Sequence, residues 1–161
     1  MRVLVDADSL KPRLRELIVR AGARNRIQVV FVANRQLPLP DAGSEPHVTM
    51  MVADDTDEWL NDHVDVGDLV VTRDIPLAAR LIGKGAEVIT DRGERYTEEN
   101  IGQRQSERAF AMRLRSSGEI TERGRRYGPR EIAEFANLLD RELTRRSKAH
   151  GEDGTSVDKD E

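Results

Sequence analysis

Aspartate residues cluster at three points in the first half of the chain. Asp6 and Asp8 come directly after the apolar run 3–5. Three more aspartates lie within residues 54–57, and Asp74 follows a second apolar run. Several carboxylates in one place repel one another unless a cation joins them, and Mg²⁺ and Mn²⁺ prefer oxygen ligands. Such a site can activate water and clamp a phosphodiester during in-line attack, so the pattern favours a metal-dependent hydrolytic site.

Helix capping is the alternative explanation for most of these residues. Asp8, Asp57 and Asp74 each stand where a helix is expected to begin, and aspartate is a favoured N-cap residue. Asp6 differs, because it follows its strand immediately and Asp8 is better placed to cap. The combination of Asp6 with the other three aspartates therefore favours a metal site over capping.

Apolar segments alternate with helical patterns over residues 2–90, and this alternation must bring the aspartates together. Five segments rich in valine, leucine and isoleucine are predicted to be buried strands: 2–5, 28–33, 47–52, 69–72 and 87–89. The segments 10–21, 56–64 and 74–83 are predicted helices. Such an alternation forms a mainly parallel sheet covered on both faces. Ligands of these sheets bind at the carboxyl ends of the strands, where Asp6 and Asp74 are expected.

Helical patterns dominate the C-terminal third of the chain. Thr97 followed by two glutamates starts one helix, and Gly128-Pro129 precedes another. We therefore expect one α/β domain over residues 1–146, with a mainly parallel central sheet flanked by helices and a helical C-terminal third. Residues 147–161 contain one apolar residue larger than alanine and are predicted to form a disordered polar tail.

The composition excludes several classes of protein. The chain has 161 residues, no cysteine and no apolar run near the roughly 18 residues of a membrane span, which excludes disulfide scaffolds, thiol nucleophiles and transmembrane proteins. The first residues lack the long apolar core of a signal peptide, and no glycine-rich phosphate loop occurs. We expect a cytoplasmic protein with no membrane contact and no nucleotide cofactor. The sequence does not indicate the oligomeric state.

Arginine supplies all the positive charge of a long later segment. Residues 92–146 contain 13 arginines and 10 acidic residues. Arginine suits phosphate recognition, although genomic base composition also explains such an excess. In the segment after the last predicted strand, Arg92 and Arg95 are predicted to hold phosphates and Tyr96 to stack on a base. A loop held by an Arg–Glu pair is the alternative.

Four segments give the chain a resemblance to a known family: 5–8, 32–34, 67–78 and 92–97. The third reads Gly-Asp-Leu-Val-Val-Thr-Arg-Asp-Ile-Pro-Leu-Ala and is the most specific. With these motifs the chain resembles the bacterial YaiI/YqxD family over about residues 3–145. One departure is Ser9-Leu10-Lys11, where family members usually have Ala-Cys-Pro.

The family is considered similar to PIN-like domains, which are α/β nucleases whose clustered acidic residues bind Mg²⁺ or Mn²⁺. The resemblance therefore implies a single PIN-like domain. It also implies that Asp6, Asp57 and Asp74 are catalytic metal ligands, and that Asp8 is a ligand or positions a water molecule. We expect from it a metal-dependent phosphodiesterase of the ribonuclease type that acts on RNA.

Two other functions stay open at this point. A non-catalytic RNA-binding or interaction module would use the arginine-rich helices for phosphate contacts, with the aspartates as caps. A haloacid-dehalogenase-type phosphatase has an opening motif similar to residues 4–10, with Asp6 as nucleophile and Asp8 as general acid. That chemistry also requires a lysine, and Lys84 is the only lysine in a plausible region.

Overall fold

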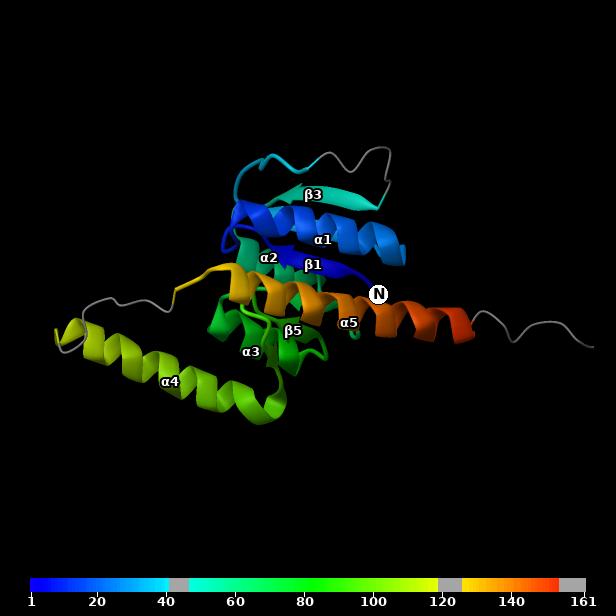
Figure 1. Cartoon of the computed structure of the whole chain (residues 1–161). Coiled ribbons are helices and arrows are strands. Elements are labelled where there is room, and N and C mark those ends of the chain that lie inside the picture. The colour runs from blue at the N-terminus through cyan, green and yellow to red at the C-terminus, as the bar shows by residue number, and fades with distance from the viewer. Residues whose placement is uncertain (41–46, 119–125, 154–161) are drawn as a thin grey trace, which may run out of the picture.

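A six-stranded sheet is the centre of the computed structural model, which describes residues 1–40, 47–118 and 126–153 (Figure 1). The strand order is β3-β2-β1-β4-β5-β6, and only the β5–β6 pair in this sheet is antiparallel. The strands are β1 (Val3–Asp6), β2 (Val29–Ala33), β3 (Val48–Val52), β4 (Leu69–Val71), β5 (Glu87–Ile89) and β6 (Arg95–Tyr96).

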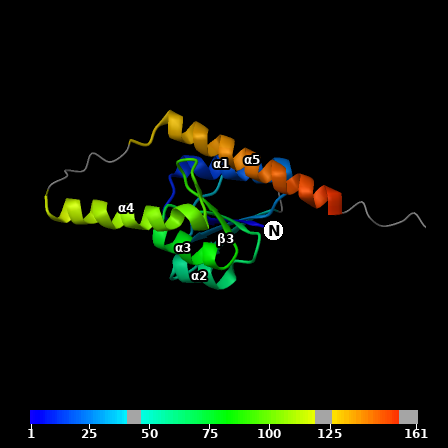
Figure 2. The same cartoon turned by 90° about the horizontal axis from the view of Figure 1, so that it is seen from below.

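Helices cover both faces of this sheet. They are α1 (Pro12–Asn25), α2 (Thr56–His63), α3 (Ile75–Gly83), α4 (Glu98–Ser116) and α5 (Pro129–Asp153). Successive strand residues point to opposite faces, so Val5 packs with Phe135 on the side of α1 and α5, while Leu4 packs with Leu81 on the side of α2 and α3 (Figure 2). No helix in the described ranges is both long and apolar enough to span a membrane.

The strand order reverses between β1 and β4. From β1 the chain passes to β2 and β3 on one side of the sheet, and β4 and β5 lie on the other side. The helices that follow β1 and β4, α1 and α3, lie on opposite faces of the sheet. The carboxyl ends of these two strands are therefore the switch point of the sheet, which is the usual ligand site of such folds. Asp6 ends β1 there, and Asp74 follows β4.

These elements confirm the predicted α/β domain with a mainly parallel sheet and a helical C-terminal part. One difference is β6, which pairs with β5 through Val88↔Tyr96 and Ile89↔Arg95 although no strand was expected there. The other is the end of α5, which lies at Asp153 and not at 146, because extending a formed helix costs far less than nucleating one. Residues 154–161 of the predicted tail lie outside the described residues.

A group of ion pairs joins α5 to the edge of the sheet. Glu142 is only 6% exposed and accepts hydrogen bonds from Arg95 at 2.7 Å, Arg146 at 2.6 Å and Arg145 at 2.8 Å. The same three arginines pair with Glu87 of β5. Burial by itself would raise the pKa of Glu142, but the hydrogen bonds from Arg145 and Arg146 and the charge of Arg95 hold this pKa below its ordinary value. The network therefore stabilises the folded state at neutral pH.

Replacing Glu142 with glutamine should lower the free energy of unfolding by about 1.5–3 kcal/mol at pH 7, the usual worth of hydrogen bonds to charged groups. Because the pKa of Glu142 is lowered in the folded state, this contribution is lost as the pH falls below the unfolded value of 4.5. Urea denaturation at pH 7 and at acid pH measures both effects. Asp140→Asn on the same helix is the control, since Asp140 and Arg24 form an exposed pair and its loss should stay within about 0.5 kcal/mol. Equal losses in the two variants would contradict the prediction.

Candidate active site

Asp6 lies at the switch point of the sheet, where β1 ends beside β4. Its side chain is on the same face as that of Leu4, the face covered by α2 and α3, and it is 4% exposed. Because β1 and β4 pair in register through Val5↔Val71, the next residues, Asp6 and Thr72, stand side by side. Thr72 donates a hydrogen bond to Asp6 Oδ2 at 2.7 Å, and the backbone N–H of Asp74 donates to Thr72 Oγ1 at 3.0 Å. This chain of hydrogen bonds fixes the Asp6 carboxylate.

The charge of Asp6 is costly in this position. Burial raises the pKa of Asp6 above its ordinary value, the Thr72 hydrogen bond works in the opposite direction, and the charges of Asp8 and Asp74 raise it further. A buried carboxylate surrounded by other carboxylates favours either a proton or a cation. Asp6 is therefore placed for the binding of positive charge.

Asp57 and Asp74 complete a group of three carboxylates, which we call the acid group (Asp6, Asp57 and Asp74). Asp57 lies in the first turn of α2, where its carboxyl group is close enough to those of Asp74 and Asp6 to feel their charges. Burial, together with the charges of Asp74 and Asp6, raises the pKa of Asp57 from 3.8 to about 6. Carboxylates this close repel one another while they are ionised, and either a proton or a cation relieves that repulsion.

The capping alternative holds for one of the three predicted caps. Asp74 does cap α3, since its Oδ1 accepts from the Leu77 N–H at 3.0 Å. The cap of α2 is Asp55, which accepts from the Glu58 N–H at 3.1 Å, so Asp57 has no capping role. α1 begins after Lys11 without any side-chain cap, so Asp8 has none either.

Asp8 instead connects three elements. Its Oδ2 accepts hydrogen bonds from the Asn34 N–H at 2.9 Å and from Thr56 Oγ1 at 2.8 Å. These bonds join the end of β1 to the end of β2 and to the start of α2. Asp8 thereby holds the first turn of α2, with Asp57, against the sheet.

The chemistry of the acid group suits a hard divalent cation, because all its donors are oxygens and it lacks positive charge. In the part of the chain that the structure describes, however, no three carboxylate or imidazole side chains already stand in a metal-binding arrangement. The residues fit Mg²⁺ or Mn²⁺ in donor type and position in the fold.

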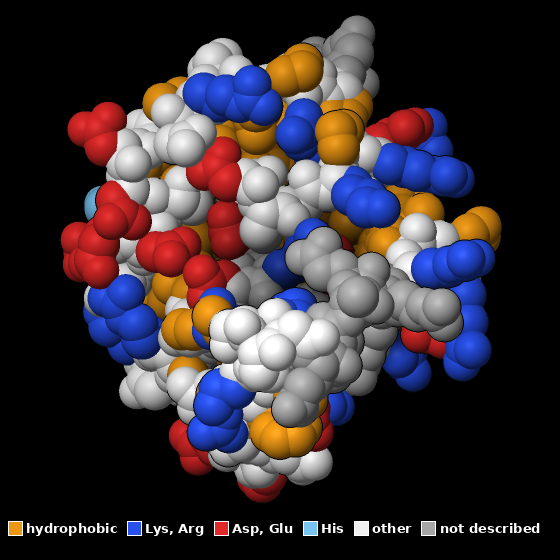
Figure 3. Space-filling view, turned by 90° about the vertical axis from the view of Figure 1, so that its left-hand side faces the viewer, with side chains coloured by type: hydrophobic (Ala, Val, Ile, Leu, Met, Phe, Trp, Pro, Cys, Tyr) orange, Lys and Arg blue, Asp and Glu red, His pale blue; other side chains and the backbone are white. Residues whose placement is uncertain are grey.

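Basic side chains lie next to the acid group, at the ends of the same strands. This basic group consists of Lys11, Arg73 and Arg92, and it surrounds Tyr127 and Asp91. Lys11 Nζ lies 4.6 Å from the centre of the Tyr127 ring and the Arg92 guanidinium 5.6 Å from it. Tyr127 donates a hydrogen bond to the backbone oxygen of Asp91 at 2.7 Å. Figure 3 shows this end of the molecule, where Asp and Glu side chains gather beside Lys and Arg side chains.

Asp91 is the buried centre of the basic group. It is 2% exposed, and its Oδ2 lies 3.3 Å from Arg73 Nε, an ion pair without hydrogen-bond geometry. Burial raises the pKa of Asp91, although the charges of Arg73, Arg92 and Lys11 all act to lower it. Burial and the Asp91 charge also raise the pKa of Tyr127, to about 12. The charge of Glu131 acts on Tyr127 as well, and that of Arg92 acts on Glu131. Lys11, Arg73 and Arg92 therefore lie near two carboxylates, and the formal charge of these five side chains is positive.

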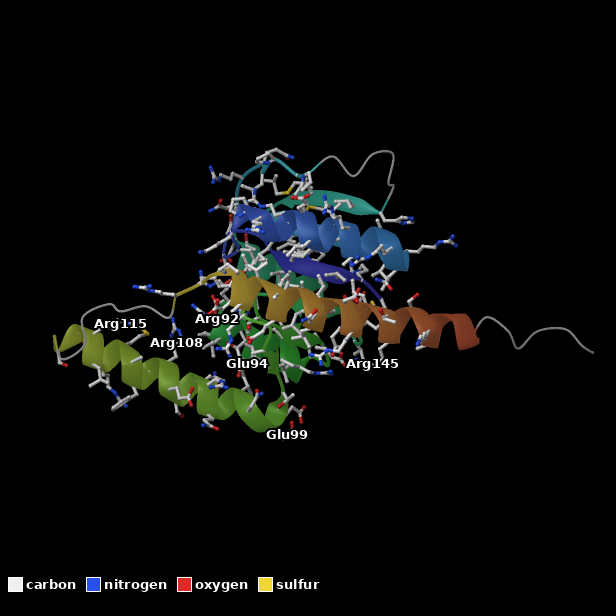
Figure 4. The ribbon with its side chains drawn as sticks, viewed as in Figure 1. Arg92, Glu94, Glu99, Arg108, Arg115 and Arg145 are labelled. Carbon is white, nitrogen blue, oxygen red and sulfur yellow. The ribbon has the colours of Figure 1, made fainter. Side chains whose placement is uncertain are left out.

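The three residues predicted to contact substrate have different positions. Arg92 lies at the carboxyl edge near the start of α5, in a turn that Gly93 makes possible by its φ of +77° (Figure 4). The guanidinium of Arg95 is directed away from this edge, to Glu87 and Glu142. Tyr96 is 8% exposed and packs in the core under α3. The structure brings Arg92 to the site and does not bring Arg95 or Tyr96 there, because β6 turns their side chains into the fold.

Four residues of the edge were not singled out from the sequence: Lys11, Thr72, Arg73 and Asp91. Thr72 lies beside Asp6 because of the register between β1 and β4. That register can be worked out only once these two strands are known to be neighbours. Asp91 and Arg73 follow the ends of adjacent parallel strands, β5 and β4. Asp6 and Asp74 were predicted because residues that follow parallel strands lie at the ligand-binding edge. The same reasoning applies to Asp91 and Arg73.

A cavity of about 470 Å³ lies at the opposite, amino edge of the sheet, with Gln28, Gly67, Glu87 and Arg145 in its lining. Arg26 and Arg146 also line it, and Glu87, the one carboxylate among its described lining residues, is already paired with Arg145 and Arg146. The closely spaced carboxylates and the net positive group both lie at the carboxyl edge. We therefore place the candidate active site there and not in this cavity.

The comparisons with known proteins identify the family to which the chain is similar. Residues 4–145 match the model of a family described as "Uncharacterized BCR, YaiI/YqxD family". A "UPF0178 protein" of Syntrophobacter fumaroxidans is 45% identical over 152 residues, which cover 94% of this chain and 99% of the relative. Others, from Myxococcus xanthus and Treponema denticola, are 43% and 39% identical, covering 90% and 92% of this chain and 95% of each relative. No solved structure matches the chain, so the PIN-like relationship stays a prediction.

Asp57→Asn should stabilise the metal-free protein at neutral pH. An acid whose folded pKa is raised holds its proton more tightly in the folded state, so the free energy of unfolding falls as the pH rises from 3.8 to about 6. The variant has no proton to lose and should show a smaller fall over this range. Urea denaturation in EDTA at pH 4, 5, 6 and 7 measures the difference.

Asp62→Asn is the matched control, because Asp62 is exposed on the same helix and lies outside the acid group. This control should keep the pH dependence of the wild type. If Asp57→Asn were less stable than the wild type at pH 7, the Asp57 carboxylate would be a stabilising structural group and the crowding argument would be wrong.

Proposed function

We propose that this chain, which belongs to the YaiI/YqxD family, is a metal-dependent phosphodiesterase that cleaves RNA at the carboxyl edge of its sheet. The observation that carries the proposal is the convergence of Asp6, Asp57 and Asp74 at the point where the strand order reverses. Three carboxylates held in mutual repulsion are destabilising without a cation. Their position is the one that ligands occupy in open parallel sheets.

The acid group would hold Mg²⁺ or Mn²⁺, and Asp8 would keep the first turn of α2 in place through Thr56 and Asn34. When bound, such an ion supplies activation of water and neutralisation of the charge that develops on a phosphodiester. Thr72 holds Asp6 in one orientation, and the N-cap bond does the same for Asp74. These contacts fix the geometry before substrate arrives.

The basic group supports a phosphodiester substrate. Arg73 is adjacent to Asp74 in sequence, and its N–H donates to Ser9 Oγ at 3.4 Å, while Ser9 Oγ donates to the Asp6 carbonyl at 3.0 Å. The acid group and the basic group are therefore neighbours. A phosphate held by the guanidinium groups would bring an adjacent phosphodiester close to the acid group.

The phosphatase alternative loses support in this structure. Its chemistry requires a lysine near the nucleophilic aspartate, and Lys84 lies at the other end of α3, where its Nζ donates to the Asn61 carbonyl. Asp8, the expected general acid, has Oδ2 occupied by Asn34 and Thr56.

A non-catalytic RNA-binding module is the second candidate. The observation that favours it is the lack of a ready-made metal arrangement among the described residues. In that case the basic group alone would carry the function, through phosphate contacts.

Mn²⁺ should stabilise the wild-type protein but not variants of the acid group. At a Mn²⁺ concentration a hundred times the dissociation constant, linkage predicts a gain of about 2.7 kcal/mol in the free energy of unfolding. Asp6→Asn and Asp57→Asn should lose most of this gain, and Asp62→Asn should keep it. Urea denaturation with and without Mn²⁺ measures the gain. If Mn²⁺ did not stabilise the wild-type protein, the proposed metal site would be wrong and the non-catalytic RNA-binding module would be favoured.

Wild-type protein with Mn²⁺ should cut single-stranded RNA slowly, and Asp6→Asn should abolish cutting while RNA binding persists, because the basic group is intact. Gel analysis of a labelled oligonucleotide measures cutting, and fluorescence anisotropy measures binding. No protein-bound phosphate should form, since water is the nucleophile. Trapping of a beryllofluoride adduct on Asp6 would instead support the phosphatase.

A further inference from the structure

The second half of α4 extends beyond the carboxyl edge of the sheet, as two perpendicular views show (Figures 1 and 2). The first half is anchored: Thr97 caps the helix, Ile101 is buried against the α3 side, and Arg104 pairs with Glu94 of the β5–β6 turn. From residue 105 to residue 118 no side chain is buried. The helix is therefore an arm beside the candidate active site.

One face of this arm carries arginines. Arg104, Arg108 and Arg115 are four and seven residues apart, a spacing that places side chains on one face of a helix. Because Arg104 pairs with Glu94, this face is turned toward the segment that contains Arg92. In Figure 4 the labelled Arg108 and Arg115 lie on the side of α4 that faces Arg92 and the start of α5. We call Arg108 and Arg115 the arm arginines.

The arm arginines have no acidic partners within the described ranges of the chain. Residues 105–118 contain three arginines and one glutamate, in a protein whose formal net charge is −4. Elsewhere on the described surface, arginines such as Arg80 and Arg130 pair with glutamates. Positive charge is thus concentrated on a projecting helix next to the basic group.

We propose that the arm arginines bind the sugar–phosphate backbone of single-stranded RNA as it leaves the active site. This inference rests on the proposed function, and it identifies the substrate as a polynucleotide longer than the site itself. Arg108 and Arg115 lie about 10 Å apart along the helix axis, at 1.5 Å of rise per residue. Together with the basic group, they form a run of positive charge from the carboxyl edge of the sheet outward along α4.

The shape of this run favours a single strand over a duplex. The basic group lies beside Asp91 and Tyr127 at the carboxyl edge of the sheet. From that edge α4 runs outward (Figures 1 and 2). A backbone that contacts both must change direction between them. A single strand does this readily, but a duplex is stiff over such short distances and has to be deformed.

The test compares RNA binding by the wild type with that of the double variant Arg108→Gln/Arg115→Gln. The probes are a fluorescein-labelled 12-nucleotide oligo(U) and a labelled UpU dinucleotide, measured by anisotropy in EDTA so that no cleavage occurs. We expect the variant to bind the 12-mer on the order of tenfold more weakly and UpU unchanged. The steepness of log K against log salt should fall by about 1.4, since each lost contact with a single strand contributes about 0.7.

Arg113→Gln is the matched control, because Arg113 is on the opposite face of α4 beside Phe110. This variant should bind the 12-mer as the wild type does.

Several results would overturn the inference. The first is that Arg113→Gln lowers the affinity for the 12-mer as much as the double variant does. The second is that the double variant binds the 12-mer as tightly as the wild type. The third is that the wild type binds a 12-base-pair duplex as tightly as the single strand. Phe110 and Met112 are exposed on the same arm. If sedimentation showed a wild-type dimer that the double variant loses, α4 would be a subunit contact instead. Because binding is measured without metal, these failures are distinct from failure of the proposed function, which appears as the absence of Mn²⁺ stabilisation and of cutting.

Discussion

The hydrogen bond from Thr72 to Asp6 depends on one constraint, the parallel pairing of β1 with β4 in register. The pairing aligns the last residue of one strand with the residue just beyond the other, on the same face of the sheet. A shift by one residue would turn Thr72 to the face of α1 and α5 and leave Asp6 buried without this bond. The hydrogen bond from the Asp74 N–H to Thr72 would then no longer connect α3 to β1.

The same pairing separates two kinds of charge at one edge. The acid group lies where α2 and α3 begin, and the basic group lies toward the starts of α1 and α5. Asp91 keeps the basic side chains together, since it is buried among Lys11, Arg73 and Arg92. In the proposed function, the basic group would bind the charge of a phosphodiester, and the acid group would hold a cation beside it.

The sequence was informative where position along a strand decides the outcome. Asp6 and Asp74 were expected at the carboxyl edge because they follow buried strands, and the structure places them there. The same reasoning failed for Arg95 and Tyr96, because they were placed in a segment beyond the last predicted strand. Once they pair as β6, the alternation of side chains sends Arg95 to Glu142 and Tyr96 into the core. Pairing with a distant strand is a non-local event, and a two-residue strand has too short a pattern to reveal it.

Apolar runs and helical periodicity in the sequence predicted five of the six strands, the helices between them and their order. Aspartates at the ends of apolar runs, in a chain without cysteine or a glycine-rich loop, also predicted a site of oxygen ligands, which stays a prediction. The tertiary structure set which residues meet. It brought Asp57 against Asp74 and made Asp55 the cap of α2. It also gave Asp8 a bracing role, buried Asp91 among cations and directed α4 past the sheet. Local sequence controls backbone conformation over a few residues, but the distance between two charges depends on strand order, register and helix packing, which arise from contacts across the whole chain.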